Sequence, residues 1–228
     1  MKSDPAREAF LHNVRQALTA GRRAGTEPEI EPRGRLGETD SVSDPTARFC
    51  HQFAKAGGAS CVVTDKAGAV SRVLETLGAK PTGKILLSQA TIIERLELAS
   101  RLRASGLAVA AVEQLGPEAA RESFFDSAVG ITGVQYLISE TGTIVLMTGV
   151  EQPRSPSLLP PVHIAIAEEK QILPDLFDVF STGEWRAQGR LPSCVTLITG
   201  PSKTGDIELR LVTGVHGPGE IHVVIVRE

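Results

Sequence analysis

The sequence predicts an α/β fold in which a largely parallel sheet is flanked by helices. From residue 59 onward, short β-rich runs alternate with stretches of helical periodicity, an order that is typical of βαβ units. The last β-rich run, residues 221–226, is apolar at nearly every position, as expected for a strand covered on both faces. No segment recurs with the period of roughly 20–50 residues that marks a repeat protein, so a solenoid or propeller is not indicated.

The first expected element is an amphipathic helix over residues 4–20. Asp4 and Pro5 are suited to the N-cap and first turn of a helix. Four apolar residues then recur at helical spacing and form one stripe: Phe10, Leu11, Val14 and Leu18. This stripe either packs on the rest of the chain or docks on a partner protein.

Residues 21–45 are predicted to be a flexible linker. Glycine, proline and charged residues dominate this stretch, and its few apolar residues cannot offset the conformational entropy that folding would cost. We therefore expect a boundary near residue 45, with the helix and linker over 1–45 and one α/β domain over 46–228.

The helices of the α/β domain are predicted from apolar periodicity together with residues that begin or end a helix. Gly78 closes one helix, and Pro117 lies near the start of another. In residues 90–104 the apolar residues share one face, and Glu97 and Arg101 are spaced for an i,i+4 ion pair outside it. The expected helices span 45–56, 66–77, 90–104, 117–127, 171–180 and 205–212.

The strands are predicted from short runs of β-branched and other apolar residues. Two of these runs are separated by only four residues, Ser139 to Gly142, which predicts a hairpin inserted into the alternating pattern. The expected strands span 59–64, 84–88, 107–112, 134–138, 143–148, 162–167, 194–199 and 221–226.

Composition argues against several classes of function. With 24 Lys and Arg against 27 Asp and Glu, the net charge of −3 does not suit a dedicated nucleic-acid-binding protein. The apolar run at residues 223–226 is far shorter than the roughly 20 residues that cross a bilayer. The N-terminal stretch lacks the continuous apolar core of a secretory signal. We therefore expect a cytoplasmic protein that contacts neither nucleic acid nor membrane.

The cysteines give no reason to expect a metal centre. Cys50, Cys61 and Cys194 are too few and too widely spaced for a zinc or iron–sulfur site, which uses closely spaced thiolates. A chain of 228 residues can also bury a sufficient core without disulfides. The motifs of common dehydrogenases and hydrolases are absent as well. We expect this chain to bind no metal or cofactor of its own.

An anion-binding turn is predicted at residues 200–204. A strand is followed there by a turn rich in glycine, proline and hydroxyl residues, and then by the expected helix at 205–212. Because N–H groups at a helix N-terminus bind phosphates and carboxylates, the candidate ligand-binding residues are Gly200, Ser202, Lys203 and Thr204. The spacing of glycine and lysine does not match a Walker A loop. The alternative interpretation is a structural connection in which Ser202 or Thr204 caps the helix.

Four further residues in turns and loops are candidates for the site. Glu140 is a candidate catalytic carboxylate that would point into the crevice of the sheet, and Gly142 beside it is a candidate ligand contact. His216 lies in a glycine-rich turn and is a candidate acid–base residue. Arg154 lies in a proline-rich loop and can bind a carboxylate with its planar guanidinium. The alternative for each charged residue is a solvated or structural position.

Several motifs in the second half of the chain occur in an order known from one protein family. Residues 128–226 closely resemble the LUD domain of the lactate utilization protein C family, whereas the N-terminal half is similar only in its general α/β pattern. Gly205 is a departure, because alanine is common there in the family. The motifs that carry the resemblance are residues 130–133, 139–143, 154–163, 199–208 and 214–218.

The resemblance implies a fold like that of the NagB, RpiA and CoA-transferase superfamily and a role in oxidising L-lactate to pyruvate. It also implies two iron–sulfur partners, lactate utilization proteins A and B, which would carry the redox centres. The first hypothesis is therefore a non-redox subunit that binds a small anion near Glu140, Arg154, Lys203 and His216. The resemblance leaves open whether this subunit is itself catalytic.

Two alternatives remain beside that hypothesis. One is a stand-alone acyl-transfer, CoA-transfer or sugar-phosphate enzyme in which Glu140 is the nucleophile or base, since some CoA transferases present their glutamate in a similar turn. The other is a structural scaffold whose turns serve only the fold.

Overall fold

The structure of the protein is a computed structural model that describes most of the chain. The chain divides into two units, residues 1–36 and 37–228. Residues 22–42, which make up most of the predicted linker, lie outside the described residues. The structure describes residues 5–21, 43–78, 83–112, 115, 117–149, 153–181, 192–207 and 210–227.

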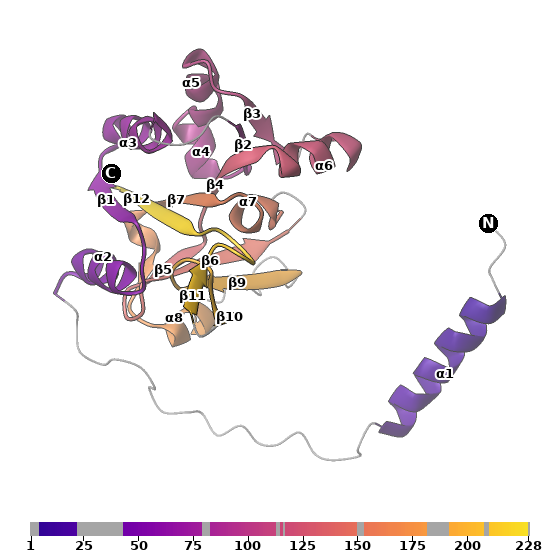
Figure 1. The fold of residues 1–228 in the computed structure, drawn as a ribbon. Coiled ribbons are helices and arrows are strands. Elements are labelled where there is room, and N and C mark those ends of the chain that lie inside the picture. Colours follow the sequence, from indigo (N-terminus) through magenta and orange to yellow (C-terminus); the bar gives the residue numbers. More distant parts are fainter. Residues whose placement is uncertain are drawn as a thin grey trace. The chain divides into compact units, whose positions relative to one another are not determined.

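The first unit contains helix α1 (Pro5–Gly21), close to the predicted range of 4–20 (Figure 1). The apolar side chains of Phe10, Val14 and Leu18 recur along it and are exposed. The helix therefore carries an apolar stripe on its surface, as its sequence periodicity predicts.

A six-stranded, wholly parallel sheet forms the centre of the second unit. The prediction of a largely parallel sheet is confirmed, and the C-terminal strand lies inside it, where both of its faces are covered. In spatial order the strands are β1 (Ser60–Thr64), β12 (Glu220–Val226), β7 (Val162–Glu168), β4 (Ser127–Gly133), β2 (Lys84–Leu87) and β3 (Val109–Ala111).

Helices α3 (Lys66–Gly78), α4 (Thr91–Arg95) and α5 (Leu98–Ala104) cover one face of this sheet (Figure 1). The helix predicted over 90–104 is broken into α4 and α5 because Glu97 adopts a left-handed conformation with φ of 50°. The expected ion pair is nevertheless present, with 3.4 Å between Glu97 Oε2 and an Arg101 guanidinium nitrogen. Helix α6 (Pro117–Phe125) precedes β4.

A second sheet of four strands lies against the other face of the first one. Helix α2 (Pro45–Lys55) completes this layer, and the shared core contains Phe49, Phe53, Leu137 and Ile144 together with apolar residues of β7 and β12. Helix α8 (Leu176–Ser181) covers the far side of the second sheet. The order of strands is β8 (Ile172–Leu173), β5 (Tyr136–Ile138), β6 (Thr143–Thr148) and β9 (Cys194–Ile198).

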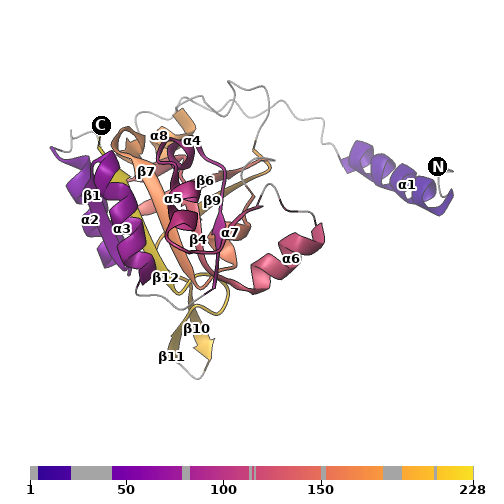
Figure 2. The same cartoon turned by 90° about the horizontal axis from the view of Figure 1, so that it is seen from above.

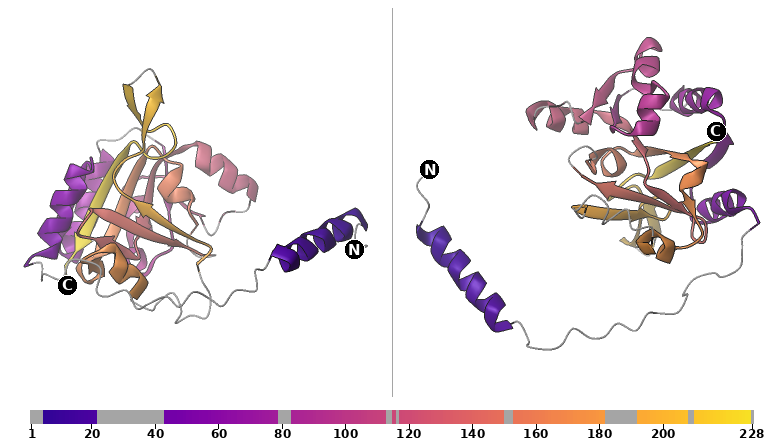
Figure 3. Two further views of the ribbon diagram at one scale, coloured as in Figure 1. Left: turned by 90° about the horizontal axis from the view of Figure 1, so that it is seen from below. Right: turned by 180° about the vertical axis from the view of Figure 1, so that it is seen from behind.

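The hairpin predicted around Ser139–Gly142 is confirmed, because β5 and β6 pair antiparallel. The helix predicted at 205–212 is wrong. Strands β10 (Lys203–Ile207) and β11 (Arg210–Thr213) form an antiparallel hairpin there, which projects from the sheets in Figures 2 and 3. Thr204 pairs with Val212 in this hairpin, and β-branched residues of this kind favour strands over helices.

Two other predicted helices end or begin at different residues. The helix predicted over 117–127 ends earlier, because Ser127 already begins the central strand β4. The helix predicted over 171–180 starts only at Leu176. A short strand, β8, precedes it, and Pro174 lies between the two. A proline is unfavourable in a helix interior, which explains the late start.

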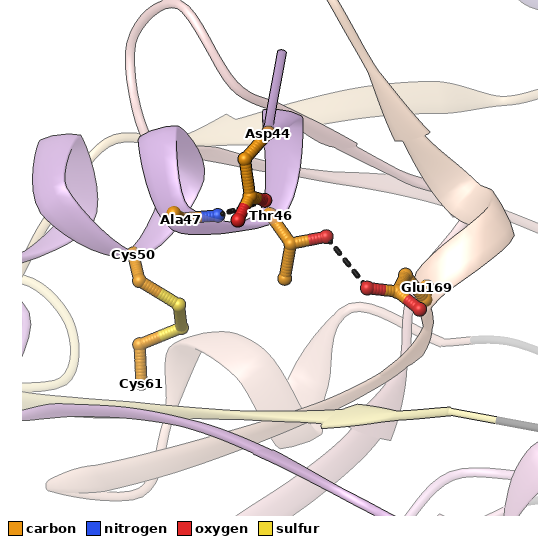
Figure 4. Close-up of a disulfide and its surroundings, with 6 residues drawn as sticks. All are labelled: Asp44, Thr46, Ala47, Cys50, Cys61 and Glu169. Carbon is orange, nitrogen blue, oxygen red and sulfur yellow. Dashed lines mark hydrogen bonds between the residues drawn. A yellow bond between two sulfur atoms is a disulfide. The ribbon is translucent and has the colours of Figure 1, made fainter.

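Cys50 and Cys61 form a disulfide between α2 and β1 (Figure 4). The length of the chain indicates that its core does not need a disulfide, and the structure nevertheless contains one. The same view shows how α2 begins, with the Asp44 side chain accepting a hydrogen bond from Ala47 N at 2.9 Å, as its predicted N-cap role requires. Among the described residues, none of the helices has the length and apolar character needed to cross a membrane.

Candidate functional site

The order of strands in the parallel sheet indicates where a ligand should bind. β2 and β4 are neighbours in this sheet. The next strand of the sheet after β2 is β3, which lies on one side of the pair, and the next after β4 is β7, which lies on the other side. Such a divergence opens a crevice outside the carboxyl ends of the two strands, which is where open α/β sheets bind their ligands. The candidate site is therefore expected just beyond Leu87 and Gly133.

A small pocket, partly open to solvent, lies at this position. Ser88 follows the end of β2, and Thr132 and Gly133 are the last residues of β4. Strands β6 and β9 of the second sheet supply another wall, and the segment before and within α7 (Ser155–Leu158) supplies the rest. The lining residues are Ser88, Thr132, Gly133, Leu146, Met147, Thr148, Pro153, Arg154, Ser157 and Thr196.

Helix α7 is held close to β4 because Gly130 has no side chain. A methyl group at Gly130 would overlap the carbonyl of Pro156, so only glycine allows this approach. Ser157 fixes the start of the helix, since both its backbone N–H and its hydroxyl donate to Arg154 O, at 3.1 and 3.0 Å. This arrangement places Arg154 at the rim of the pocket.

The pocket combines one guanidinium with several hydroxyl groups. Arg154 is exposed, and its side chain has no hydrogen-bond or ion-pair partner within the part of the chain that the structure describes. Among the described lining residues none is acidic, whereas five of them carry a hydroxyl group. An unpaired guanidinium beside neutral donors suits a small anion, above all a carboxylate that can accept two parallel hydrogen bonds.

A buried histidine lies behind the pocket wall. His163 Nε2 is 2.9 Å from Thr132 Oγ1, and its Nδ1 has no hydrogen-bond partner among the described side chains and backbone groups. Complete burial, together with the nearby His222, lowers the pKa of His163 to about 4. The imidazole is therefore neutral near pH 7.

The turn that contains Glu140 and Gly142 lies at the other end of β6. Glu140 is exposed, so this turn gives a carboxylate nucleophile no shielding from water. Gly142 is buried with φ of 67°, and a side chain there would overlap the backbone of Gln52 and Phe53 in α2. Gly142 thus allows close packing of this turn against α2.

Lys203 lies at the end of a helix rather than over a ligand pocket. Its Nζ donates to Ala56 O at 2.9 Å, where α2 presents its last carbonyl groups. Gly200 packs against the same carbonyl with φ of 80°. A cation at the C-terminus of a helix is electrostatically favourable, which gives Lys203 a stabilising contact in the fold.

Ser202 and Thr204 flank Lys203 in the sequence, and the loop that carries His216 lies beside them in the structure. Ser202 N donates to Pro218 O at 2.9 Å, which holds its segment beside the loop that carries His216. The side chain of His216 is exposed, and Thr204 belongs to the β10–β11 hairpin. Because residues 203–207 and 210–213 form strands, the predicted anion site has no helix N-terminus at residue 205.

The predicted residues therefore do not form one site. Arg154 lies at the Thr148 end of β6, and Glu140 and Gly142 lie beyond its Thr143 end. The two ends of this strand are roughly 16 Å apart at the usual rise per residue. A hydroxyl contact of 2.7 Å between Thr143 and Thr199 places the Gly200 turn at that second end as well.

Sequence reasoning missed the pocket residues other than Arg154. Ser88, Thr132 and Ser157 are separated along the chain, and only the fold brings them together. His163 does give a signal, because a histidine within the apolar strand Val162–Glu168 needs a polar partner in the core. No group of three or more His, Cys, Asp and Glu side chains that could hold a metal occurs in the described ranges.

Comparison with known proteins shows the family of the chain. An "Uncharacterized protein YkgG" of Escherichia coli strain K12 is 30% identical over 230 residues, covering 97% of this chain and 98% of that protein. Proteins named "Lactate utilization protein C" from Halalkalibacterium halodurans and Bacillus subtilis are 41% and 40% identical over 102 residues. These matches cover 44% of this chain and 44% and 42% of the two relatives.

A solved structure supports the same fold. The crystal structure of a DUF162 family protein from Deinococcus radiodurans superposes with a TM-score of 0.56 and covers 82% of this chain and 99% of that one, at 23% identity. The LUD domain family model matches residues 46–226, nearly the whole second unit. The chain belongs to the LUD domain family.

Proposed function

We propose that this protein is a non-redox subunit of an L-lactate oxidation system and binds a small carboxylate in the pocket beside Arg154. The observation that carries the proposal is the guanidinium of Arg154, which has no partner among the described residues and lies at a pocket whose described lining is rich in hydroxyl groups and contains no acidic side chain. The relatives named "Lactate utilization protein C" support lactate metabolism as the setting.

The chemistry of the pocket suits lactate or pyruvate. The guanidinium can form two parallel hydrogen bonds with the carboxylate, and the Thr132 hydroxyl can bind the oxygen on the neighbouring carbon. Leu146 and Met147 provide apolar surface for the methyl group. A ligand of this size needs only a few such contacts for specific binding.

We further propose that iron–sulfur partner proteins, lactate utilization proteins A and B, carry the electrons. Oxidation of lactate to pyruvate removes two electrons and two protons, which requires a redox centre. The three cysteines of this chain do not have cluster spacing, and two of them form a disulfide. In this proposal the subunit binds lactate or pyruvate, and its partners take up the electrons that lactate loses.

The ligand proposal is tested by thermal unfolding of the purified protein with L-lactate, pyruvate, phosphate, ribose phosphate and acetyl-CoA. A ligand at about 100 times its dissociation constant should add ~2.7 kcal/mol to the free energy of unfolding. We expect stabilisation by lactate or pyruvate that is lost in Arg154→Gln and retained in Lys203→Gln, which removes a cation outside the pocket.

The opposite pattern would contradict the proposed site. Stabilisation lost in Lys203→Gln and retained in Arg154→Gln would move the site to the turn near α2. Stabilisation by acetyl-CoA or ribose phosphate that depends on Glu140 would favour the stand-alone enzyme. If no compound stabilises the protein, the scaffold interpretation is favoured.

The partner proposal is tested in cells. We expect a tagged chain to copurify with iron–sulfur proteins and its deletion to prevent growth on L-lactate. Arg154→Gln should reproduce the growth defect at normal protein abundance, whereas Lys203→Gln should not. Fractionation of the same cells tests the expected cytoplasmic location.

A further inference from the structure

His163 gives the proposed pocket a specific hydrogen-bonding character. We infer that His163 is a positioning residue that fixes the Thr132 hydroxyl as a donor into the pocket, so that the site prefers a 2-oxo acid to the corresponding 2-hydroxy acid. The inference rests on the proposed function, because it concerns the ligand of the same pocket. Beyond the proposed function, it specifies 2-oxo acids as the preferred ligands and assigns a role to His163, which does not line the pocket.

The two residues lie on neighbouring strands, Thr132 on β4 and His163 on β7. The distance from His163 Nε2 to Thr132 Oγ1 is 2.9 Å, and both residues are buried. Thr132 lines the pocket, whereas the imidazole lies behind it. His163 can therefore reach a ligand only through Thr132.

The surroundings of His163 determine which of its nitrogens carries the proton. A neutral imidazole has one N–H, and either nitrogen can hold it. A proton on Nδ1 would be a buried donor without an acceptor among the described residues, and such donors are rarer in proteins than unpaired acceptors. A proton on Nε2 is instead donated to Thr132 Oγ1. The ring stays neutral near pH 7, since burial lowers its pKa to about 4.

This tautomer determines what Thr132 offers a ligand. When Thr132 Oγ1 accepts from His163, its own hydrogen is available to the pocket. The guanidinium of Arg154 has only donors as well. A keto oxygen beside a carboxylate only accepts hydrogen bonds and matches both groups. A hydroxyl at the same position brings an additional hydrogen for which this contact provides no acceptor, and an unpaired polar group lowers affinity.

Calorimetric titration with pyruvate and L-lactate tests the preference. We expect the wild-type protein to bind pyruvate more tightly, and Thr132→Val to weaken pyruvate binding about three- to tenfold. Thr132→Ser keeps the hydroxyl and should retain the affinity. Thr76→Val is the matched control, because Thr76 donates to Arg72 O on the exposed side of α3, away from the pocket.

His163 itself is tested by two variants and one spectroscopic measurement. Glutamine can place an N–H near the position of Nε2, so His163→Gln should retain most of the pyruvate affinity, whereas His163→Leu should lose it to the same extent as Thr132→Val. Nitrogen-15 NMR of the wild-type imidazole should show the Nε2–H tautomer. This measurement decides the question even if His163→Leu does not fold.

Three results would overturn the inference: an Nδ1–H tautomer, tighter binding of lactate than of pyruvate, or pyruvate binding that is unchanged in Thr132→Val. In each case a ligand that still depends on Arg154 leaves the proposed function intact. If neither acid binds the wild-type protein, the proposed function fails together with the inference.

Discussion

Lys203 shows how a residue with apparent ligand-binding chemistry can serve the fold. In the sequence it follows a turn rich in glycine and hydroxyl residues and precedes an acidic stretch. In the structure its ammonium group donates to Ala56 O at the end of α2. Sequence alone could not distinguish these roles, because the acceptor lies 147 residues away along the chain.

Replacing Lys203 with methionine should therefore affect stability and not binding. Lys203→Met keeps the aliphatic stem and removes the charge near the carbonyl groups of α2, which should lower the free energy of unfolding by about 0.5–1 kcal/mol. Urea unfolding measures this loss. A larger effect on pyruvate affinity than on stability would show that Lys203 belongs to the ligand site.

His163 should give the protein a pH-dependent stability. Burial lowers its pKa in the folded state to about 4, whereas an exposed histidine has an ordinary value of 6.5. Below pH 6.5 the unfolded chain therefore binds a proton that the folded protein does not, and stability decreases as the pH falls toward 4. The shift corresponds to roughly 3 kcal/mol at most.

The contribution of His163 is measured by urea unfolding between pH 7 and pH 4 in the wild type and in His163→Gln, which cannot titrate. The decrease should be smaller in the variant by up to that amount. Identical pH profiles would show that His163 is accessible to protons in the folded state.

Helices and strands with a strong periodic pattern of apolar residues were predicted correctly from the sequence. Helices α2 and α3 and strands β2, β6, β7 and β12 lie within a residue or two of their predicted ranges. The central strand β4 was missed, because Gly130 and Gly133 weaken its β-rich pattern. Glycine is needed at these two positions because Pro156 and Ala90 pack closely against them, and no local sequence pattern reveals such contacts.

The missed strand also explains why the pocket could not be predicted. Its lining depends on β4 lying beside β2 and on α7 lying over Gly130. Arg154 was identified from its proline-rich loop, but the remaining predicted residues follow local turn patterns. The turns at Gly142 and Gly200 lie against α2 and its C-terminal end, where glycine is needed for packing.

Gly130→Ala should disrupt the pocket because it displaces helix α7. The added methyl group would collide with the Pro156 carbonyl and push α7 away from β4, at a cost of about 1–3 kcal/mol. Pyruvate binding should weaken strongly in this variant. Gly78→Ala is the control, because nothing lies within 4 Å of the added carbon. Equal effects of the two substitutions in urea unfolding and calorimetry would contradict this role of Gly130.

The disulfide between α2 and β1 should stabilise the second unit. Cys50 and Cys61 are separated by 11 residues, and closing a loop of this size contributes about 2–3 kcal/mol in the chain-entropy model. Urea unfolding with and without reductant, and of the Cys50→Ser/Cys61→Ser double variant, measures this contribution. Cys194→Ser should have no comparable effect. Titration of three free thiols in the native protein would contradict the disulfide.

In the second unit as a whole, the topology of the parallel sheet and the chemistry of its side chains indicate the same position for a ligand site. The divergence of β2 and β4 creates a crevice at their carboxyl ends, and the pocket with Arg154 lies there. The turns that contain Glu140, Lys203 and His216 lie elsewhere and make contacts that support the fold. The site is thus set by the strand order of the parallel sheet, and the second sheet supplies its other wall.

The central claim is that this pocket binds a small carboxylate through Arg154, and a crystal structure of the protein with pyruvate tests it most directly. We expect density for the ligand in the pocket, with its carboxylate on the Arg154 guanidinium and its keto oxygen within hydrogen-bond distance of Thr132 Oγ1. Density beside Lys203 and His216, or an empty pocket in crystals grown at a saturating pyruvate concentration, would contradict the claim.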